Sequence, residues 1–468
     1  MSTRGEPEAQ GSVVRPDSSS RFKRWAARRG RQLLLVFLGL SCVLVLLAAS
    51  ALLRRGTCLI GLPDVGDPFD VSTVYAERIP DDRNAFAYYR KALAKLQPHP
   101  NAPLAMLDAV KAVEWSKADP RIRALIESNH EALDLFRRGA EQADAWAHPA
   151  KGETAFYYER MHLHPFVKMI FLEASRLEEL GDMAGAWVWY RTFLRMRAHV
   201  MRRGTAFERY FANQNGSELL RRAGHWAADP KTQVIDLRGA LEDVIAFEPK
   251  PEWEASALKV DYLLAMRELE HPGAVLSSGY TEERKYEIGG EPLPPNLAQT
   301  VHAIRRFLIR EPERSRRILR LAFANWLAHI EIPEERHRKP AVRALLENKS
   351  VNPGVYFYAA GPAAPASARA LALQDLAEWL LTAPDARMLQ GQWLWPSIGT
   401  QERRQHRALL ILLAEELYHR EHGQPPSSEN DLVGTYLKHL PDDGSADLAD
   451  GTMSIVEDSQ NNRSERMP

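Results

Sequence analysis

Cysteine is nearly absent from this sequence. Its 468 residues include only two cysteines, Cys42 and Cys58. Both lie near the N-terminus, so no disulfide framework can hold the remaining body together. A chain of this length can bury hydrophobic cores that are large enough to fold without such bonds. We expect two free thiols, with a disulfide between two chains at Cys58 as the open alternative.

Several catalytic motifs are also missing. The sequence has no G-x-x-x-x-G-K-[ST], no G-x-G-x-x-G and no G-x-S-x-G. These are the loops that hold a phosphate with backbone amides or present a nucleophilic serine on a strained turn. Their absence argues against the common nucleotide-binding and hydrolase classes.

The histidines form no recognisable set of metal ligands. His162 and His164 are two apart, and Pro165 favours an extended backbone on which both could face one side. His419 and His422 are three apart, but the glycine that follows is expected to end their helix at once. We expect surface or capping histidines, with no metal site and no cofactor.

The charges balance over the whole chain but not at its ends. The formal net charge is zero. Residues 1–31 contain eight basic and three acidic residues, whereas residues 441–468 contain two basic and seven acidic ones. A basic segment beside a membrane sets the topology and can contact anionic lipid headgroups. Nothing in this distribution suggests a nucleic acid partner.

One long apolar run dominates what is present. Residues 33–53 carry no charge and are bracketed by Arg31 and by Arg54 and Arg55. As a helix the run spans about 31 Å, which matches a hydrocarbon core of about 30 Å. Basic residues are concentrated before it, so the N-terminus is expected in the cytoplasm. The run predicts a single-pass protein of the cell membrane that contacts the bilayer through residues 33–53, with its C-terminal body on the extracytoplasmic side.

A cleaved signal peptide is the rival interpretation of the same run. Ala49, Ser50 and Ala51 form the small-x-small pattern that a signal peptidase accepts. The apolar run is longer than the roughly 7–15 residues of a usual signal. We therefore favour an uncleaved anchor.

The remainder of the chain has the period of α-helices. Apolar residues recur at helical spacing, for example at Phe86, Tyr89 and Leu93. Strand signals are few, so the predicted class is all-α: one N-terminal transmembrane helix followed by an α-helical exterior. The predicted organisation is a basic cytoplasmic tail (1–31), a transmembrane helix (32–53), a spacer (54–82), a first helical domain (83–271), a linker (272–297), a second helical domain (298–441) and an acidic disordered tail (442–468).

Two segments resemble tetratricopeptide repeats. In residues 84–101, Ala85, Tyr89, Ala92 and Leu93 occupy the small, aromatic, small and apolar positions of a repeat's second helix, and Pro98 ends it. Residues 169–194 give a fuller match. There Ala174 lies in the first helix, Gly181-Asp182 forms the turn, and Ala186, Tyr190 and Leu194 follow. The resemblance implies paired helices in a TPR-like domain, and a generic helical hairpin is the alternative.

The segment 408–441 is similar to the region that follows the long helix of type II secretion pseudopilins. Tyr418, Gly423, Pro425, Leu432 and Val433 carry this weak match. From the residues alone we expect a helix that stops at Gly423, then a short helix capped by Ser427 or Ser428 with Asp431 in its first turn. We interpret the segment as packing.

Two further features have a structural and a functional interpretation. Seven arginines between Arg305 and Arg320 lie opposite an apolar side with Leu319, Phe323 and Trp326. They suit an amphipathic core helix whose arginines pair with Glu311 and Glu313, or a grip on anionic lipid or an acidic partner. Trp393 and Trp395 are expected to pack in a loop, with stacking on a sugar or a partner as the alternative.

The favoured function is protein–protein interaction by a membrane-tethered scaffold or adaptor. Its predicted contact face is a helical surface around Tyr89, Trp187 and Tyr190, which requires these rings to be exposed. The alternative is a cell-envelope enzyme that acts on peptide or glycan, with His162, His164 and Trp395 as its candidate residues.

Overall fold

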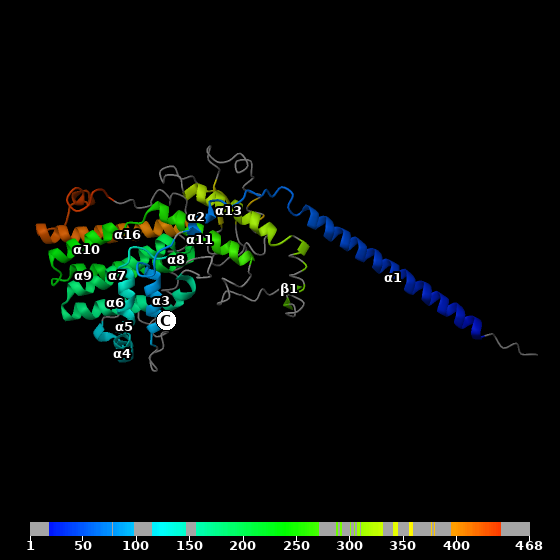
Figure 1. Ribbon diagram of the computed structural model, residues 1–468, viewed down its shortest axis with the longest axis horizontal. Coiled ribbons are helices and arrows are strands. Elements are labelled where there is room, and N and C mark those ends of the chain that lie inside the picture. The colour runs from blue at the N-terminus through cyan, green and yellow to red at the C-terminus, as the bar shows by residue number, and fades with distance from the viewer. Residues whose placement is uncertain are drawn as a thin grey trace, which may run out of the picture. The chain divides into compact units, whose positions relative to one another are not determined.

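A computed structural model describes most of the chain as helices. The described residues are 18–76, 78–97, 115–146, 156–270, 310–330, 340–344, 355–358 and 395–440, with short pieces at 287–288, 291–292, 300, 304, 307–308, 376 and 379. Two compact units are present: residues 1–61 with 294–311, and residues 62–293 with 312–468. The prediction of a mostly helical protein is confirmed (Figure 1).

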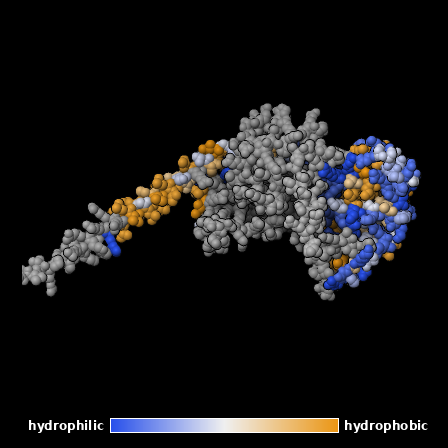
Figure 2. Space-filling view, turned by 180° about the vertical axis from the view of Figure 1, so that it is seen from behind, coloured by the Kyte–Doolittle hydropathy of each residue, from blue (hydrophilic) through white to orange (hydrophobic). Residues whose placement is uncertain are grey.

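The first unit is dominated by one long helix. Helix α1 (Ser18–Thr57) begins before the apolar run and includes residues 18–31, so part of the predicted tail is helical. Its apolar side chains are exposed; Leu33 and Leu46, for example, are each 69% exposed. Figure 2 shows the hydrophobic colour along most of this helix. By length and composition, Leu33–Thr57 could cross a membrane.

The second unit contains the remaining helices and two small sheets. The helices are α2 (Val71–Ala76), α3 (Ala85–Lys95), α4 (Pro120–Ser128), α5 (His130–Ala140), α6 (Phe156–Leu180), α7 (Met183–Arg203), α8 (Ala206–Gln214), α9 (Gly216–Ala228), α10 (Val234–Ala246), α11 (Pro251–Glu270), α13 (Glu313–Ile330) and α16 (Trp395–His422), with 3-10 turns η2 (Trp115–Lys117) and η6 (Glu429–Leu432). Strands β1 (Glu287–Ile288) and β2 (Glu291–Pro292) pair antiparallel, as do β3 (Pro340–Ala344) and β4 (Val355–Tyr358).

The hairpin predicted at residues 169–194 is present. Gly181 takes a φ of +82°, a left-handed conformation that suits glycine, and reverses the chain between α6 and α7. The side chain of Asp182 then caps α7 by accepting a hydrogen bond from the backbone N–H of Gly185 at 2.9 Å. The local sequence therefore dictates both the turn and the start of the second helix.

Helix α6 corrects the prediction at Pro165. The backbone is one continuous helix from Phe156 to Leu180, with Pro165 inside it, where we expected an extended segment. A proline removes one helical hydrogen bond and crowds the preceding turn. Buried Leu163, Phe166 and Val167 surround this position, and we infer that their packing offsets the cost.

Helices α3 and α5 pack closely together. A Cβ atom added to Gly139 of α5 would lie 2.9 Å from the Tyr88 Cβ and from the Tyr89 ring, so a larger residue would push the two helices apart. The side chain of Asn84 caps α3 by accepting from the Phe86 N–H, and its amide donates to the Trp146 carbonyl at 2.8 Å. Helix α3 is thus fixed to the end of the α5 segment.

The C-terminal helix belongs to the same core as the earlier helices. Leu409, Leu413 and Leu417 of α16 are buried in one cluster with residues of α3, α5, α6, α7, α9 and α10. Helix α16 lies beside α9 and α10 (Figure 1). We predicted a separate second domain over residues 298–441, which include α16. The structure instead places the apolar face of α16 in the core of the predicted first domain.

Residues 62–70, predicted as part of a spacer, are attached to α11 and α13. Leu62 is buried, and its carbonyl accepts a hydrogen bond from Arg317 at 3.1 Å. Arg320 pairs with Asp64 at 2.9 Å and with Asp67 at 3.1 Å. The Tyr262 hydroxyl also donates to Asp67. This segment is therefore held by the body from Leu62 onward.

Candidate functional site

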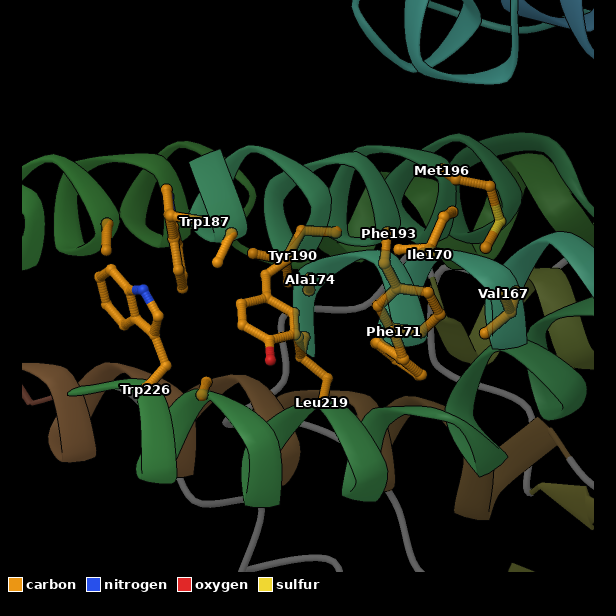
Figure 3. Close-up of a cluster of buried hydrophobic side chains, with 14 of the residues drawn as sticks. Val167, Ile170, Phe171, Ala174, Trp187, Tyr190, Phe193, Met196, Leu219 and Trp226 are labelled. Atoms are coloured by element: carbon orange, nitrogen blue, oxygen red, sulfur yellow. The ribbon is translucent and has the colours of Figure 1, made fainter. Parts of the chain in front are cut away.

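The three aromatic residues of the predicted contact face are in the core. Tyr89 and Tyr190 are 0% exposed and Trp187 is 5% exposed. Figure 3 shows Trp187 and Tyr190 directed toward Trp226 and Leu219 of α9. The centroids of the Trp187 and Trp226 rings are 4.8 Å apart. A contact face needs exposed rings, so this prediction is corrected: the helical period identified the packed side of these helices.

Each of these rings also has an internal partner for its polar atom. The Tyr89 hydroxyl lies 2.9 Å from Nδ1 of His199, and the Tyr190 hydroxyl donates to Glu178 at 2.6 Å. Nε1 of Trp187 donates to Asp243 at 2.9 Å. The polar atoms of the three rings are thus bonded within the protein and do not point to an external ligand.

His199 links three segments from within this region. Its Nε2 lies 3.0 Å from the Gln142 carbonyl, which can only accept, so Nε2 carries the proton and Nδ1 accepts from Tyr89. Burial lowers the pKa of His199 to about 4. The neutral ring therefore ties α7 to α3 and to the segment after α5 at neutral pH.

A second buried region, which the sequence analysis missed, is polar. Arg209 of α8 and Glu402 of α16 are each 1% exposed and form a two-pronged ion pair, in which Nε lies 2.9 Å from Oε1 and Nη2 bonds to Oε2. Arg197 of α7 donates to Asn213 and to Gln405, both at 2.8 Å. We call Arg197, Arg209, Asn213, Glu402, Gln405 and His406 the buried polar cluster.

Burial shapes the electrostatics of this cluster. It lowers the pKa of Arg197 to about 10, and nearby Arg209 acts in the same direction. It lowers the pKa of His406 to about 3, with Arg197 adding to the effect. For Arg209, burial acts against the charge, but Glu402 more than offsets it and raises the pKa. Glu402 therefore pairs with Arg209, and the contacts of the cluster hold α16 against α7 and α8.

One signal in the sequence could have identified the cluster. Glu402 and His406 are four apart and precede Leu409 and Leu413 on the same helical face. Polar residues that continue an apolar face indicate buried groups that need partners. The position of Arg209 opposite Glu402 depends on a contact across 193 residues, which no local pattern contains.

A shallow surface groove follows α16. Two adjoining hollows, each of about 450 Å³, share Leu412 and Glu415. We call them the α16 groove; it is lined by Gly224, Ala227, Arg404, Arg407, Ala408, Ile411, Leu412, Glu415, Glu416, His419, Pro425, Pro426 and Glu429. Arg407 pairs with Glu429 at 2.5 Å, and Glu416 pairs with Arg420 at 2.6 Å. The groove has an apolar floor between charged side chains.

The segment that resembles pseudopilins folds as its residues predicted. Helix α16 ends at His422, before Gly423, and η6 is capped by Ser428 with Asp431 reaching back to it. Leu432 is fully buried. His422 lies against Tyr418, with ring centroids 4.3 Å apart.

Three arginines of the arginine-rich segment, Arg316, Arg317 and Arg320, form ion pairs. Arg316 and Arg317 bond to Glu313 at 2.9 and 2.8 Å, as the interpretation as an amphipathic helix requires. Leu319, Phe323 and Trp326 on its other side are buried. Several residues singled out in the sequence lie outside the described residues: Arg305, Arg306, Trp393 and Pro98. The same holds for the side chains of His162, His164 and Trp395.

The described residues hold no group of three or more His, Cys, Asp or Glu side chains that could bind a metal ion. Comparisons with known proteins add no assignment: no family model, no curated protein and no solved structure matches this chain.

Proposed function

We propose that this protein is a single-pass membrane protein that presents a helical protein-binding body on the extracytoplasmic side. The main observation that supports this proposal is the exposed, charge-free stretch of α1. This stretch follows a strongly basic segment and precedes a well-packed helical body in the chain. Exposed apolar side chains along a full bilayer length are expensive in water and stable in lipid. The basic residues before them favour an N-terminus in the cytoplasm.

The body acts as a scaffold or adaptor, and the α6–α7 hairpin supports a TPR-like architecture for it. Because the three rings are buried, we propose the α16 groove as the contact surface in their place. Glu415 is exposed in this groove, and partial desolvation together with Glu429 raises its pKa. A complementary occupant is a partner peptide segment with an apolar side chain for Ile411 and Leu412 and a lysine or arginine for Glu415.

The topology can be tested at the native thiols of the full chain. Cys58 follows α1 directly and is partly exposed, whereas Cys42 lies within it. In intact cells, a membrane-impermeant maleimide should label Cys58 but not the Cys58→Ser variant. Labelling of Cys58 only after the cells are opened would overturn the orientation, and a shortened mature chain that begins near residue 52 would show cleavage instead of anchoring.

The groove can be tested by photocrosslinking in native membranes. A photoreactive residue at His419, an exposed groove position, should capture a partner, and one at exposed Glu127 of α4 serves as the matched control. Adding Glu415→Lys should reduce capture about ten-fold by removing the charge complementarity. Equal capture at both positions, or no effect of Glu415→Lys, would reject the groove as the contact surface.

A further inference from the structure

Helix α10 carries an outward face that the core does not use. Its buried side consists of Leu237, Ala240, Leu241 and Val244, which pack in the core with α7 and α16. Its outward side exposes Ile235 by 67%, Ile245 by 42% and Val234 by 37%. Large aliphatic side chains are therefore exposed along a helix whose opposite side is already packed in the core.

The outward face is complementary to itself in an antiparallel arrangement. If two copies of α10 cross near residue 240 about a two-fold axis, Ile235 of one copy lies opposite Ile245 of the other. The same operation places Arg238 opposite Glu242. Two apolar pairs and two pairs of opposite charge then form at once, as an isologous contact requires.

The charged residues are available for this contact. Glu242 is exposed and has no ion pair with any residue that the structure describes. Arg238 has a side chain that is 48% exposed and donates through Nη2 to Glu421 of its own chain at 2.5 Å. A guanidinium has further N–H groups that can serve a second carboxylate.

We propose that a second copy of this chain docks on α10, with the two α10 helices antiparallel and crossing near residue 240. A single helix pair buries less than the roughly 1,200–2,000 Å² of a stable interface in solution. Two copies that share a bilayer are held at a high effective concentration, so a weak contact suffices. The fit itself rests on α10 alone and requires neither the α16 groove nor an external partner.

The first test is a disulfide between copies of the full-length chain. In a background with Cys42→Ser and Cys58→Ser, differently tagged copies that carry Arg238→Cys and Glu242→Cys, which the arrangement places opposite each other, should form a covalent dimer in membranes under mild oxidation. Glu127→Cys, an exposed helical position on α4, is the matched control and should give at least about ten-fold less dimer. Equal crosslinking at both positions would overturn the proposal.

The second test separates the proposed pairing from chance collision by charge. Copies with Glu242→Arg place Arg238 against an arginine, and copies with Arg238→Glu place a glutamate against Glu242, so neither should pair with itself. Differently tagged copies of the two variants should pair with each other, because both cross-chain contacts are again of opposite charge. Self-pairing of either variant at the wild-type level, or failure of the mixture to exceed each variant alone about ten-fold, would refute the antiparallel arrangement.

Discussion

Helix α7 contributes to two interiors that differ in chemistry. Its first half supplies Trp187, Tyr190 and Phe193 to an aromatic core with α6 and α9 (Figure 3). Toward its end, Arg197 enters the buried polar cluster with α8 and α16. The aromatic core gains from the apolar area it buries and tolerates approximate fit. The polar cluster depends on each partner being present, because an unpaired buried charge is costly.

The two regions also join different parts of the chain. The aromatic core unites helices that are near neighbours in sequence, as the α6–α7 hairpin illustrates. The polar cluster joins α8 to α16, which lie almost two hundred residues apart along the chain. We infer that the polar cluster selects the position of α16 on the body, while the aromatic core provides most of the driving force for folding.

Removing one member of the buried ion pair should have the largest effect. Arg209→Met leaves Glu402 charged and buried, and we expect a loss of about 3–5 kcal/mol in the free energy of unfolding. Adding Glu402→Leu should recover most of the loss, because two apolar residues then replace the pair. Denaturant titration of the full chain in detergent measures both variants. If the double variant is no more stable than Arg209→Met, the cluster does not act as a pair.

A conservative change at Tyr89, a buried ring of α3, should cost less. Tyr89→Phe keeps the ring but leaves Nδ1 of His199 without its donor, and about 1–3 kcal/mol of stability should be lost in the same titration. The neighbouring change Tyr88→Phe is the matched control. Its hydroxyl makes an exposed contact with the Asp82 carbonyl, so its loss should be close to zero. Equal effects would show that the Tyr89–His199 contact contributes nothing specific.

The polar cluster should make stability depend on pH through His406. Burial lowers the pKa of His406 to about 3, below its ordinary value near 6.5. As the pH falls below 6.5 the unfolded chain takes up a proton that the folded one does not, so stability is lost at up to about 1.4 kcal/mol per pH unit. His406→Gln should reduce this slope by that amount between pH 6 and pH 4. An unchanged slope would mean that His406 is protonated in the folded state.

The smallest effect is expected when the same arginine change is made on the surface. Arg137 of α5 pairs with Asp134 and Glu141, both at 2.7 Å, and all three side chains are partly exposed. Arg137→Met should cost less than about 0.5 kcal/mol because water replaces the lost partners. A cost close to that of Arg209→Met would mean that burial does not separate the two kinds of pair.

Local predictions succeeded where a few neighbouring residues decide the outcome. The turn at Gly181 and Asp182, the end of α16 and the cap of η6 at Ser428 are all present. Each depends on groups within about four residues of one another. Helical period also located packed faces, since Phe86 and Tyr89 are both buried.

The candidate site was harder to predict than the helices. An aromatic residue on a helix suits a binding face and a core equally well, and only the presence of α9 and α10 makes Trp187 and Tyr190 buried. The same limit applies to residues 62–70, which were predicted as part of a spacer but whose Asp64 and Asp67 pair with Arg320 and Tyr262. Burial is a property of what lies opposite a residue.

The sequence alone determined the all-helical class, the apolar helix that is long enough to cross a membrane and the local caps and turns, because these follow from periodicity and from near neighbours. Only the tertiary structure decided that the aromatic rings are core, that Arg209 meets Glu402 and that the outward face of α10 remains uncovered. These outcomes depend on contacts between distant segments, whose pairing is set by the packing of the whole body rather than by any local pattern.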